Sequence, residues 1–260
     1  MTDWRFYIMD KRYAVLIDAD NVSEKYIKPI LDEISNEGVI TYKRIYGDWT
    51  RPALASWKQA LLNHSITPIQ QYSYTTGKNS TDSAMIIDAM DILYSHNVDG
   101  FCIVSSDSDF TRLAARLRES GMHVVGMGEK KTPNPFIAAC NRFVYLENLA
   151  QGEVSDTAEQ DKDKSDDEVH EVVKTKTIKN AICSIIGEVS DDDGWASLSE
   201  VGNILLKRYP SFDVRNFGFQ KLTPFIKSLG KFEIYSIPSE KGNVKAVSYT
   251  HLTLPTNREV

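Results

Sequence analysis

The sequence predicts an α/β domain built on a parallel sheet, followed by a smaller helical domain with a short β element. Short apolar segments rich in β-forming residues alternate with segments of helical length up to about residue 149. An acidic segment without aromatic residues, EVSDTAEQDKDKSDDEVHE, then interrupts this alternation, and the pattern that follows is mainly helical. Because right-handed crossovers join strands that are separated by helices, the strands of the first domain should lie parallel, with helices on both faces.

The elements of the first domain follow from local signals. Ser23 is a favoured residue before a helix and Gly38 a favoured residue after one, while Pro29 between them predicts a kink. The predicted strands are Tyr13–Asp18, Val39–Tyr46, Thr67–Ser73, Phe101–Ser106 and Met122–Met127. The predicted helices are Ser23–Asn36, Pro52–Asn63, Thr81–Ser95, Phe110–Ser120 and a short helix near Phe136, which precedes the segment FVYLENL.

Composition divides the chain into four parts. Residues 10–149 form the first domain, and residues 150–173 form a linker that buries too little apolar surface to offset its ordering entropy. In residues 174–246, an amphipathic segment TIKNAICSIIGEV, helices at Leu198–Arg208 and Phe219–Leu229, and the strand FEIYSI predict a winged-helix-like module. Residues 247–260, VSYTHLTLPTNREV, resemble a translated sequencing adapter, and we expect a non-native tail there.

The overall composition favours a cytoplasmic globular protein. Hydrophobic residues make up 42% and charged residues 25%, which is enough for a sizeable core. The net charge of −6 predicts no general attraction to polyanions, although a binding patch can be local. Cys102, Cys140 and Cys183 are far apart in the sequence and have apolar neighbours, so we expect buried free thiols. Neither a signal peptide nor a membrane-spanning apolar run is present in the sequence.

Acidic and small polar residues follow the predicted strands where function gathers in a parallel sheet. The carboxyl ends of such strands meet at one edge, near the point where the strand order reverses. The residues expected near this edge are Asp18, Asp20, Asn21, Asp82, Asp88, Ser106, Asp107 and Asp109. Carboxylates brought together repel one another, and Mg²⁺ and Mn²⁺ prefer oxygen ligands. The pattern therefore predicts a Mg²⁺ or Mn²⁺ site that hydrolyses phosphodiester bonds.

Other interpretations of these residues stay open. Asp107 or Asp109 can cap the following helix, and Asp82 can be a first-turn acid favoured by the helix dipole. The turn after the first strand has no glycine, which argues against a dinucleotide site, and neither a GxxxxGK[ST] loop nor a GxSxG elbow occurs in the sequence. A haloacid-dehalogenase-type phosphatase is the nearest rival, because DAD is similar to its DxD motif, but Val22 and Ser23 stand where its Thr is expected.

Three motifs resemble the NYN family of PIN-like ribonuclease domains in order and spacing. They are LIDADN, GKNSTDSAMIIDAM and VDGFCIVSSDSDFTRLAARLRESGMHVVGMG, and the resemblance covers about Tyr13 to Leu149. It implies a Rossmann-like sheet with a Mg²⁺- or Mn²⁺-dependent nuclease site. The implied metal-binding and catalytic residues are Asp18, Asp82, Asp107 and Asp109. The implied supporting residues are Asp20, Asn21, Lys78, Ser106 and Asp88, of which Ser106 stands where the family often has Gly.

The second domain resembles the LOTUS (OST-HTH) domain, which is often joined to NYN domains. The segments WASLSEVGNILL and NFGFQKLTPFIKSLGKFEI carry this resemblance, which implies binding of RNA or of a protein partner such as a helicase. Candidate contacts to the RNA backbone are Arg44, Lys78, Arg112, Lys130, Arg215 and Lys221. The sequence thus predicts a metal-dependent ribonuclease, an endonuclease acting on single-stranded RNA. The alternative is a catalytically silent RNA-binding regulator.

Overall fold

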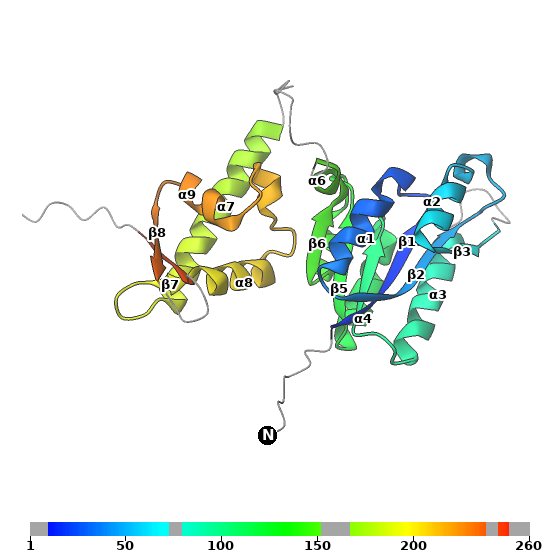
Figure 1. Cartoon of the computed structure of the whole chain (residues 1–260), viewed down its shortest axis with the longest axis horizontal. Helices are drawn as coiled ribbons and strands as arrows, with labels where there is room; N and C mark the ends of the chain where they lie inside the picture. Colours follow the sequence, from blue (N-terminus) through cyan, green and yellow to red (C-terminus); the bar gives the residue numbers. More distant parts are fainter. Residues whose placement is uncertain (1–9, 73–79, 152–166, 238–243, 250–260) are drawn as a thin grey trace, which may run out of the picture. The chain divides into compact units, whose positions relative to one another are not determined.

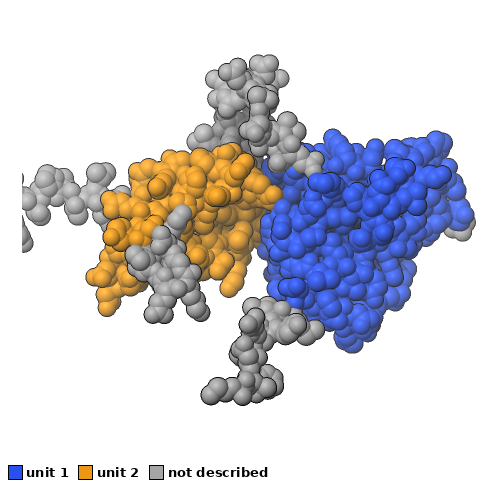
Figure 2. Space-filling view, in the orientation of Figure 1, with its two compact units in different colours: residues 1–157 blue, residues 158–260 orange. Residues whose placement is uncertain are grey.

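The computed structural model describes residues 10–72, 80–151, 167–237 and 244–249. The chain divides into two compact units, Met1–Thr157 and Ala158–Val260, which Figure 2 shows in different colours. No helix in these described ranges is both long and apolar enough to cross a membrane.

The first unit contains a parallel sheet in which the strand order is β3-β2-β1-β4-β5-β6. Its strands are β1 (Arg12–Asp18), β2 (Val39–Gly47), β3 (Thr67–Gln70), β4 (Gly100–Val104), β5 (His123–Gly128) and β6 (Arg142–Tyr145). The order reverses between β1 and β4, so the chain leaves these two strands in opposite directions. A crevice for ligands is expected at their carboxyl ends.

Helices cover both faces of this sheet (Figure 1). On one face lie α1 (Ile27–Ser35), α2 (Trp57–His64) and α6 (Leu146–Gln151), and on the other α3 (Ser80–Tyr94), α4 (Thr111–Glu119) and α5 (Asn134–Ala139). In β1, Val15 and Ile17 pack with the first group, and Ala14 and Leu16 with the second. A strand buried on both faces needs the continuous apolar run of YAVLI, and the predicted α/β architecture is confirmed.

Several element boundaries differ from the sequence prediction. A short 3-10 turn, η1 (Glu24–Tyr26), precedes α1, so Pro29 lies in the first turn of α1. Its missing N–H costs no intrahelical bond at that position, which is why a proline is accommodated there. Similarly, α2 begins at Trp57, after the 3-10 turn η2 (Pro52–Leu54). The segment FVYLENL is divided between β6 and α6.

In its described residues, the second unit combines three α-helices with a small antiparallel sheet in the order β7-β9-β8. The helices are α7 (Asp167–Val189), α8 (Leu198–Arg208) and α9 (Leu222–Ser228), and the strands are β7 (Ala196–Ser197), β8 (Phe232–Ile237) and β9 (Val244–Tyr249). Ile182, Val201, Leu205 and Ile226 form the centre of its core, each with no exposed surface. The predicted small helical domain with a short β element is confirmed.

Three elements extend past expected domain boundaries. Helix α7 begins at Asp167, so residues 167–173 of the predicted linker are helical, and α6 extends to Gln151. Strand β9 runs to Tyr249, beyond the expected end at residue 246. The reason is that Val247 pairs with Ala196 and Ile234 and is fully buried in the core. The rest of the predicted tail, residues 250–260, lies outside the described residues.

Candidate metal centre

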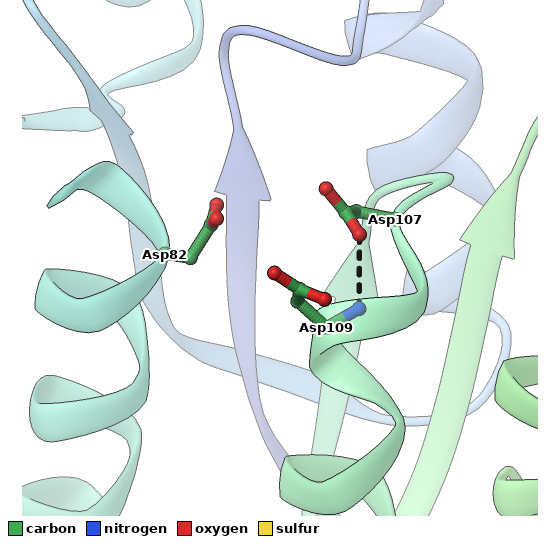
Figure 3. Close-up of side chains that lie close together, drawn as sticks. All are labelled: Asp82, Asp107 and Asp109. Atoms are coloured by element: carbon green, nitrogen blue, oxygen red, sulfur yellow. Dashed lines mark hydrogen bonds between the residues drawn. The ribbon is translucent and has the colours of Figure 1, made fainter. Parts of the chain in front are cut away.

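Three carboxylates converge at the carboxyl edge of the parallel sheet. Asp82 lies in the first turn of α3, Asp107 in the turn after β4, and Asp109 in the 3-10 turn η3 (Ser108–Phe110). One oxygen from each lies within 4.8 Å of the other two, and Figure 3 shows the three side chains pointing toward one another. Asp82 and Asp107 are half-buried and Asp109 is exposed. The group is therefore open to solvent on one side.

The turn after β4 explains how two of these carboxylates are held. The side chain of Asp107 caps η3, because its Oδ1 accepts the backbone N–H of Asp109 at 2.9 Å (Figure 3). The backbone N–H of Asp107 in turn donates to Oγ of Ser105 at 3.1 Å. The capping and the ligand interpretations of Asp107 are thus compatible. The bond that caps η3 also fixes the direction of the carboxylate.

The carboxylates create an unfavourable negative potential at this edge. Loss of solvent, followed by the charges of Asp18, Asp107, Asp109 and Asp20, raises the pKa of Asp82 to about 6. Neighbouring anions disfavour ionisation, and a bound cation removes this penalty. All three converging donors are carboxylate oxygens, the ligand type that Mg²⁺ and Mn²⁺ prefer. The residues present therefore fit a hard divalent cation.

Asp18, the fourth predicted ligand, lies outside the group of converging oxygens. Its side chain is buried at the end of β1, where it accepts bonds from Asn21 Nδ2 at 2.6 Å, Ser105 Oγ at 2.8 Å and the N–H of Asp20 at 3.0 Å. Burial raises the pKa of Asp18, although these hydrogen bonds oppose the rise. Asp18 therefore joins the ends of β1 and β4 and adds negative charge beside Asp82.

Ser106 and Asp20 also form hydrogen bonds at the carboxyl edge of the sheet. Ser106 is buried, and its Oγ accepts the backbone N–H of Glu129 at 2.8 Å, which ties the turn after β4 to the end of β5. A serine at this position therefore supplies a bond that glycine lacks. Asp20 accepts hydrogen bonds from Arg51 and Thr81. Lys78, the predicted phosphate contact, lies outside the described residues.

Asp88, predicted as a supporting residue of the site, contacts Arg44 and Tyr46. It lies nearly two turns after Asp82 on α3, and its carboxylate accepts hydrogen bonds from Arg44 and Tyr46 of β2. Arg44 and Tyr46 alternate along β2 and so face the same side of the sheet, which α3 covers. Asp88 therefore fastens α3 to β2, away from the converging carboxylates. Arg44, a predicted contact with RNA, is thus paired with Asp88 in this structure.

Comparison with known families agrees with the predicted fold class. The model of the NYN domain matches residues 12–147, which is more than half of the chain. The chain belongs to the NYN family. The model of the OST-HTH/LOTUS domain matches residues 164–244, and the second unit is an OST-HTH/LOTUS domain. Both families are those that the sequence motifs resemble.

Individual relatives add little about function. An uncharacterized protein of Methanocaldococcus jannaschii is 27% identical over 123 residues, which are 46% of this chain and 48% of that protein. The chain thus spans about half the length of the curated relative that it matches. A crystal structure of a protein of unknown function from Vibrio parahaemolyticus has a TM-score of 0.47 at 19% identity, covering 57% of this chain and 98% of its own. A solution NMR structure from Chromobacterium violaceum has a TM-score of 0.26 at 31% identity, covering 31% of this chain and 88% of its own. Both TM-scores are low, and neither structure supports an argument about this protein.

Four further basic residues of the NYN and OST-HTH/LOTUS domains were predicted to contact RNA. Arg112 and Lys130 are exposed, and the backbone N–H of Lys130 donates to Glu147 at 2.9 Å. In the second domain, Lys221 is exposed, while the guanidinium of Arg215 donates to Asp213 at 2.6 Å.

The sequence analysis did not predict three residues at the carboxyl edge of the parallel sheet, namely Arg51, Thr81 and Ser105. Ser105 and Thr81 stand next to predicted site residues, but a hydroxyl gives no sequence signal of its own until its partner is known. Arg51 follows the carboxyl end of β2. The rule that drew attention to the residues after the first and fourth strands applies to this loop as well.

Proposed function

We propose that the NYN domain is a Mg²⁺- or Mn²⁺-dependent ribonuclease that cleaves single-stranded RNA as an endonuclease. The observation that carries this proposal is the convergence of Asp82, Asp107 and Asp109 where the strand order reverses. Membership of the NYN family supports it, as does the presence of an OST-HTH/LOTUS domain in the same chain. An edge that is open at Asp109 is compatible with a flexible single strand reaching the carboxylates.

The aspartates and Ser105 at the carboxyl ends of the strands have different roles in this proposal. Asp82, Asp107 and Asp109 would hold the cation, and Asp18 would add charge from behind. A bound Mg²⁺ or Mn²⁺ supplies positive charge for the phosphoryl oxygens and lowers the pKa of a coordinated water. The hydroxyl of Ser105 orients two strand ends at once, because it donates to Asp18 and accepts the N–H of Asp107. The site is thereby organised before substrate arrives.

The second domain has a supporting role in this proposal. We propose that the OST-HTH/LOTUS domain binds RNA or a protein partner and so brings substrate to the NYN domain. Its exposed Lys221 is a candidate phosphate contact. A cytoplasmic location is part of the proposal: Cys102, Cys140 and Cys183 are all free thiols, as is usual in a reducing compartment. The first two are buried, and Cys183 is only partly buried.

Cleavage of labelled single-stranded RNA with Mn²⁺ or Mg²⁺ tests the nuclease proposal. Asp107→Asn keeps the shape of the side chain and removes a charge, so the rate should fall about a hundredfold or more. Asp91→Asn is the matched control, because Asp91 is an exposed aspartate on α3, and its rate should equal that of the wild type. Circular RNA distinguishes endonuclease from exonuclease action, since only an endonuclease linearises it.

The other outcomes are equally informative. Equal cleavage by wild type and Asp107→Asn would locate the activity elsewhere or in a contaminant. Absence of cleavage by the wild type, with RNA still bound, would favour the alternative function, a catalytically silent RNA-binding regulator. Absence of Mn²⁺ or Mg²⁺ binding in a calorimetric titration would favour it as well.

A further inference from the structure

A positively charged side chain is built into the rim of the acidic edge. Arg51 lies in the loop between β2 and η2, and its Nη1 donates to Oδ1 of Asp20 at 2.8 Å. The other oxygen of Asp20 accepts the hydroxyl of Thr81 at 3.3 Å. Thr81 immediately precedes Asp82 in α3. Asp20 therefore connects Arg51 to the residue next to one of the converging carboxylates.

The loop that carries Arg51 has a fixed shape. Asp48 is buried at its base, and Oδ1 of Asp48 accepts the hydroxyl of Thr50 at 2.6 Å, the N–H of Thr50 at 3.2 Å and Nε2 of Gln70 at 2.9 Å. The backbone carbonyl of Asp48 accepts the N–H of Arg51 at 3.0 Å. Gln70, at the end of β3, also accepts the N–H of Trp49 at 2.9 Å. The ends of two strands thus set the position from which Arg51 reaches the edge.

Folding stability alone does not explain this arrangement. The side chain of Arg51 is 53% exposed and that of Asp20 is 34% exposed, and ion pairs in such positions contribute little to stability. The contact with Asp20 engages Nη1, while a guanidinium carries five N–H donors in a planar fork. Such a fork binds phosphate oxygens in pairs, which a point charge does not do. Arg51 is thus oriented, accessible to solvent and chemically suited to a phosphodiester.

We propose that Arg51 forms a phosphate-binding subsite that holds the RNA backbone beside Asp82, Asp107 and Asp109. This inference rests on the proposed ribonuclease function and names a residue that contacts its substrate. RNA phosphates approaching this edge meet several carboxylates, and repulsion between like charges opposes their approach. Arg51 offsets that repulsion at the rim, and Asp20 keeps the guanidinium from turning away. The ligand is a phosphodiester group of RNA.

Single-turnover cleavage by the full chain in Mn²⁺ tests the subsite. With Arg51→Ala, the protein concentration that gives half-maximal rate should rise about tenfold, as expected for loss of a charged hydrogen bond. Its dependence on salt should weaken by a slope of about 0.7, corresponding to one phosphate contact on a single strand. Arg51→Lys should show a smaller loss, because it keeps the charge without the fork. The unfolding midpoint of Arg51→Ala should stay within about 4 °C of the wild type.

Arg116→Ala is the matched control for these variants. Arg116 is an exposed arginine of α4, so its replacement removes the same charge away from the loop that carries Arg51. The half-saturating concentration of this variant should equal that of the wild type. An equal loss with Arg116→Ala would show a general charge effect and overturn the subsite.

Hydrogen exchange provides a readout that does not depend on cleavage. RNA should protect the loop of residues 48–51 in the wild type, and this protection should be lost in Arg51→Ala. If the wild type fails to cleave RNA but shows this protection, the nuclease proposal fails while the subsite stands. Unchanged half-saturation, salt slope and protection in Arg51→Ala would overturn the subsite, whether or not the wild type is a nuclease.

Discussion

Asp82 connects the candidate metal centre to a measurable change in folding stability. Loss of solvent and the neighbouring carboxylates raise the pKa of Asp82 from 3.8 to about 6. A carboxyl whose pKa is raised by folding binds its proton more tightly in the folded than in the unfolded chain. The contribution of Asp82 to the free energy of unfolding is then greatest below pH 3.8 and falls as the pH rises to about 6. Asp82→Asn removes this loss, so the variant should be more stable than the metal-free wild type at neutral pH.

The size of the effect follows from the pKa change. A rise from 3.8 to about 6 corresponds to at most about 3 kcal/mol, at ~1.4 kcal/mol for each pH unit. Asp82 is only half-buried, and solvent screens part of this energy, so we expect a gain of about 1 kcal/mol. The gain should be mostly lost near pH 4, where Asp82 is protonated in the folded chain and partly protonated in the unfolded chain.

Urea denaturation in EDTA at about pH 7.5 and about pH 4 measures both values. Asp91→Asn serves as control, because it makes the same replacement at an exposed position of α3. Its stability should follow the wild type at both pH values. Addition of Mn²⁺ should stabilise the wild type and the control and should stabilise Asp82→Asn much less. An Asp82→Asn variant that is less stable than the wild type at neutral pH in EDTA would refute the electrostatic argument.

Three further substitutions test other contacts in the two domains. Tyr46→Phe removes the buried hydroxyl that binds Asp88, so the free energy of unfolding measured in urea should fall by about 1 kcal/mol. The affinity for Mn²⁺ should stay unchanged. Weaker Mn²⁺ binding at unaltered stability would contradict this role of Tyr46. Gly128→Ala places a methyl group 2.6 Å from the carbonyl oxygen of Ser105, so the free energy of unfolding should fall by about 1–3 kcal/mol. The variant should also bind Mn²⁺ more weakly in a calorimetric titration. Wild-type stability together with wild-type Mn²⁺ binding would contradict this steric argument. Ile182→Ala opens a cavity in the core of the OST-HTH/LOTUS domain, so the free energy of unfolding of that domain should fall by about 2–4 kcal/mol. Mn²⁺ binding by the NYN domain should persist, because the two units are separately compact. Loss of Mn²⁺ binding in this variant would contradict the independence of the two units.

The pattern of the sequence was sufficient for the layers of the fold. Continuous apolar runs such as YAVLI require a strand with two covered faces, and alternation with helices requires parallel strands. The positions of Asp82, Asp107 and Asp109 after strands or at a helix start also predicted that they would meet. These inferences hold because hydrophobic periodicity and crossover handedness are local properties of the chain.

Only the tertiary structure showed which side chains the aspartates at the carboxyl ends of the strands contact. Periodicity states which side chains face a layer, but not which strands are neighbours. The order β3-β2-β1-β4-β5-β6 places β1 beside β4, which allows Ser105 to bind Asp18. The same order brings β2 under α3, where Arg44 and Tyr46 bind Asp88.

Arg51 shows the same division between sequence and structure. The sequence places it after a strand, like many surface arginines, and it is the adjacency of β2 and β1 that brings it to Asp20. A charged side chain takes the partner that folding places within a few ångströms, because Coulomb and hydrogen-bond energies fall steeply with distance. The sequence by itself therefore determined the layers, the parallel strands and the acidic edge. The strand order decided which side chains those acids contact.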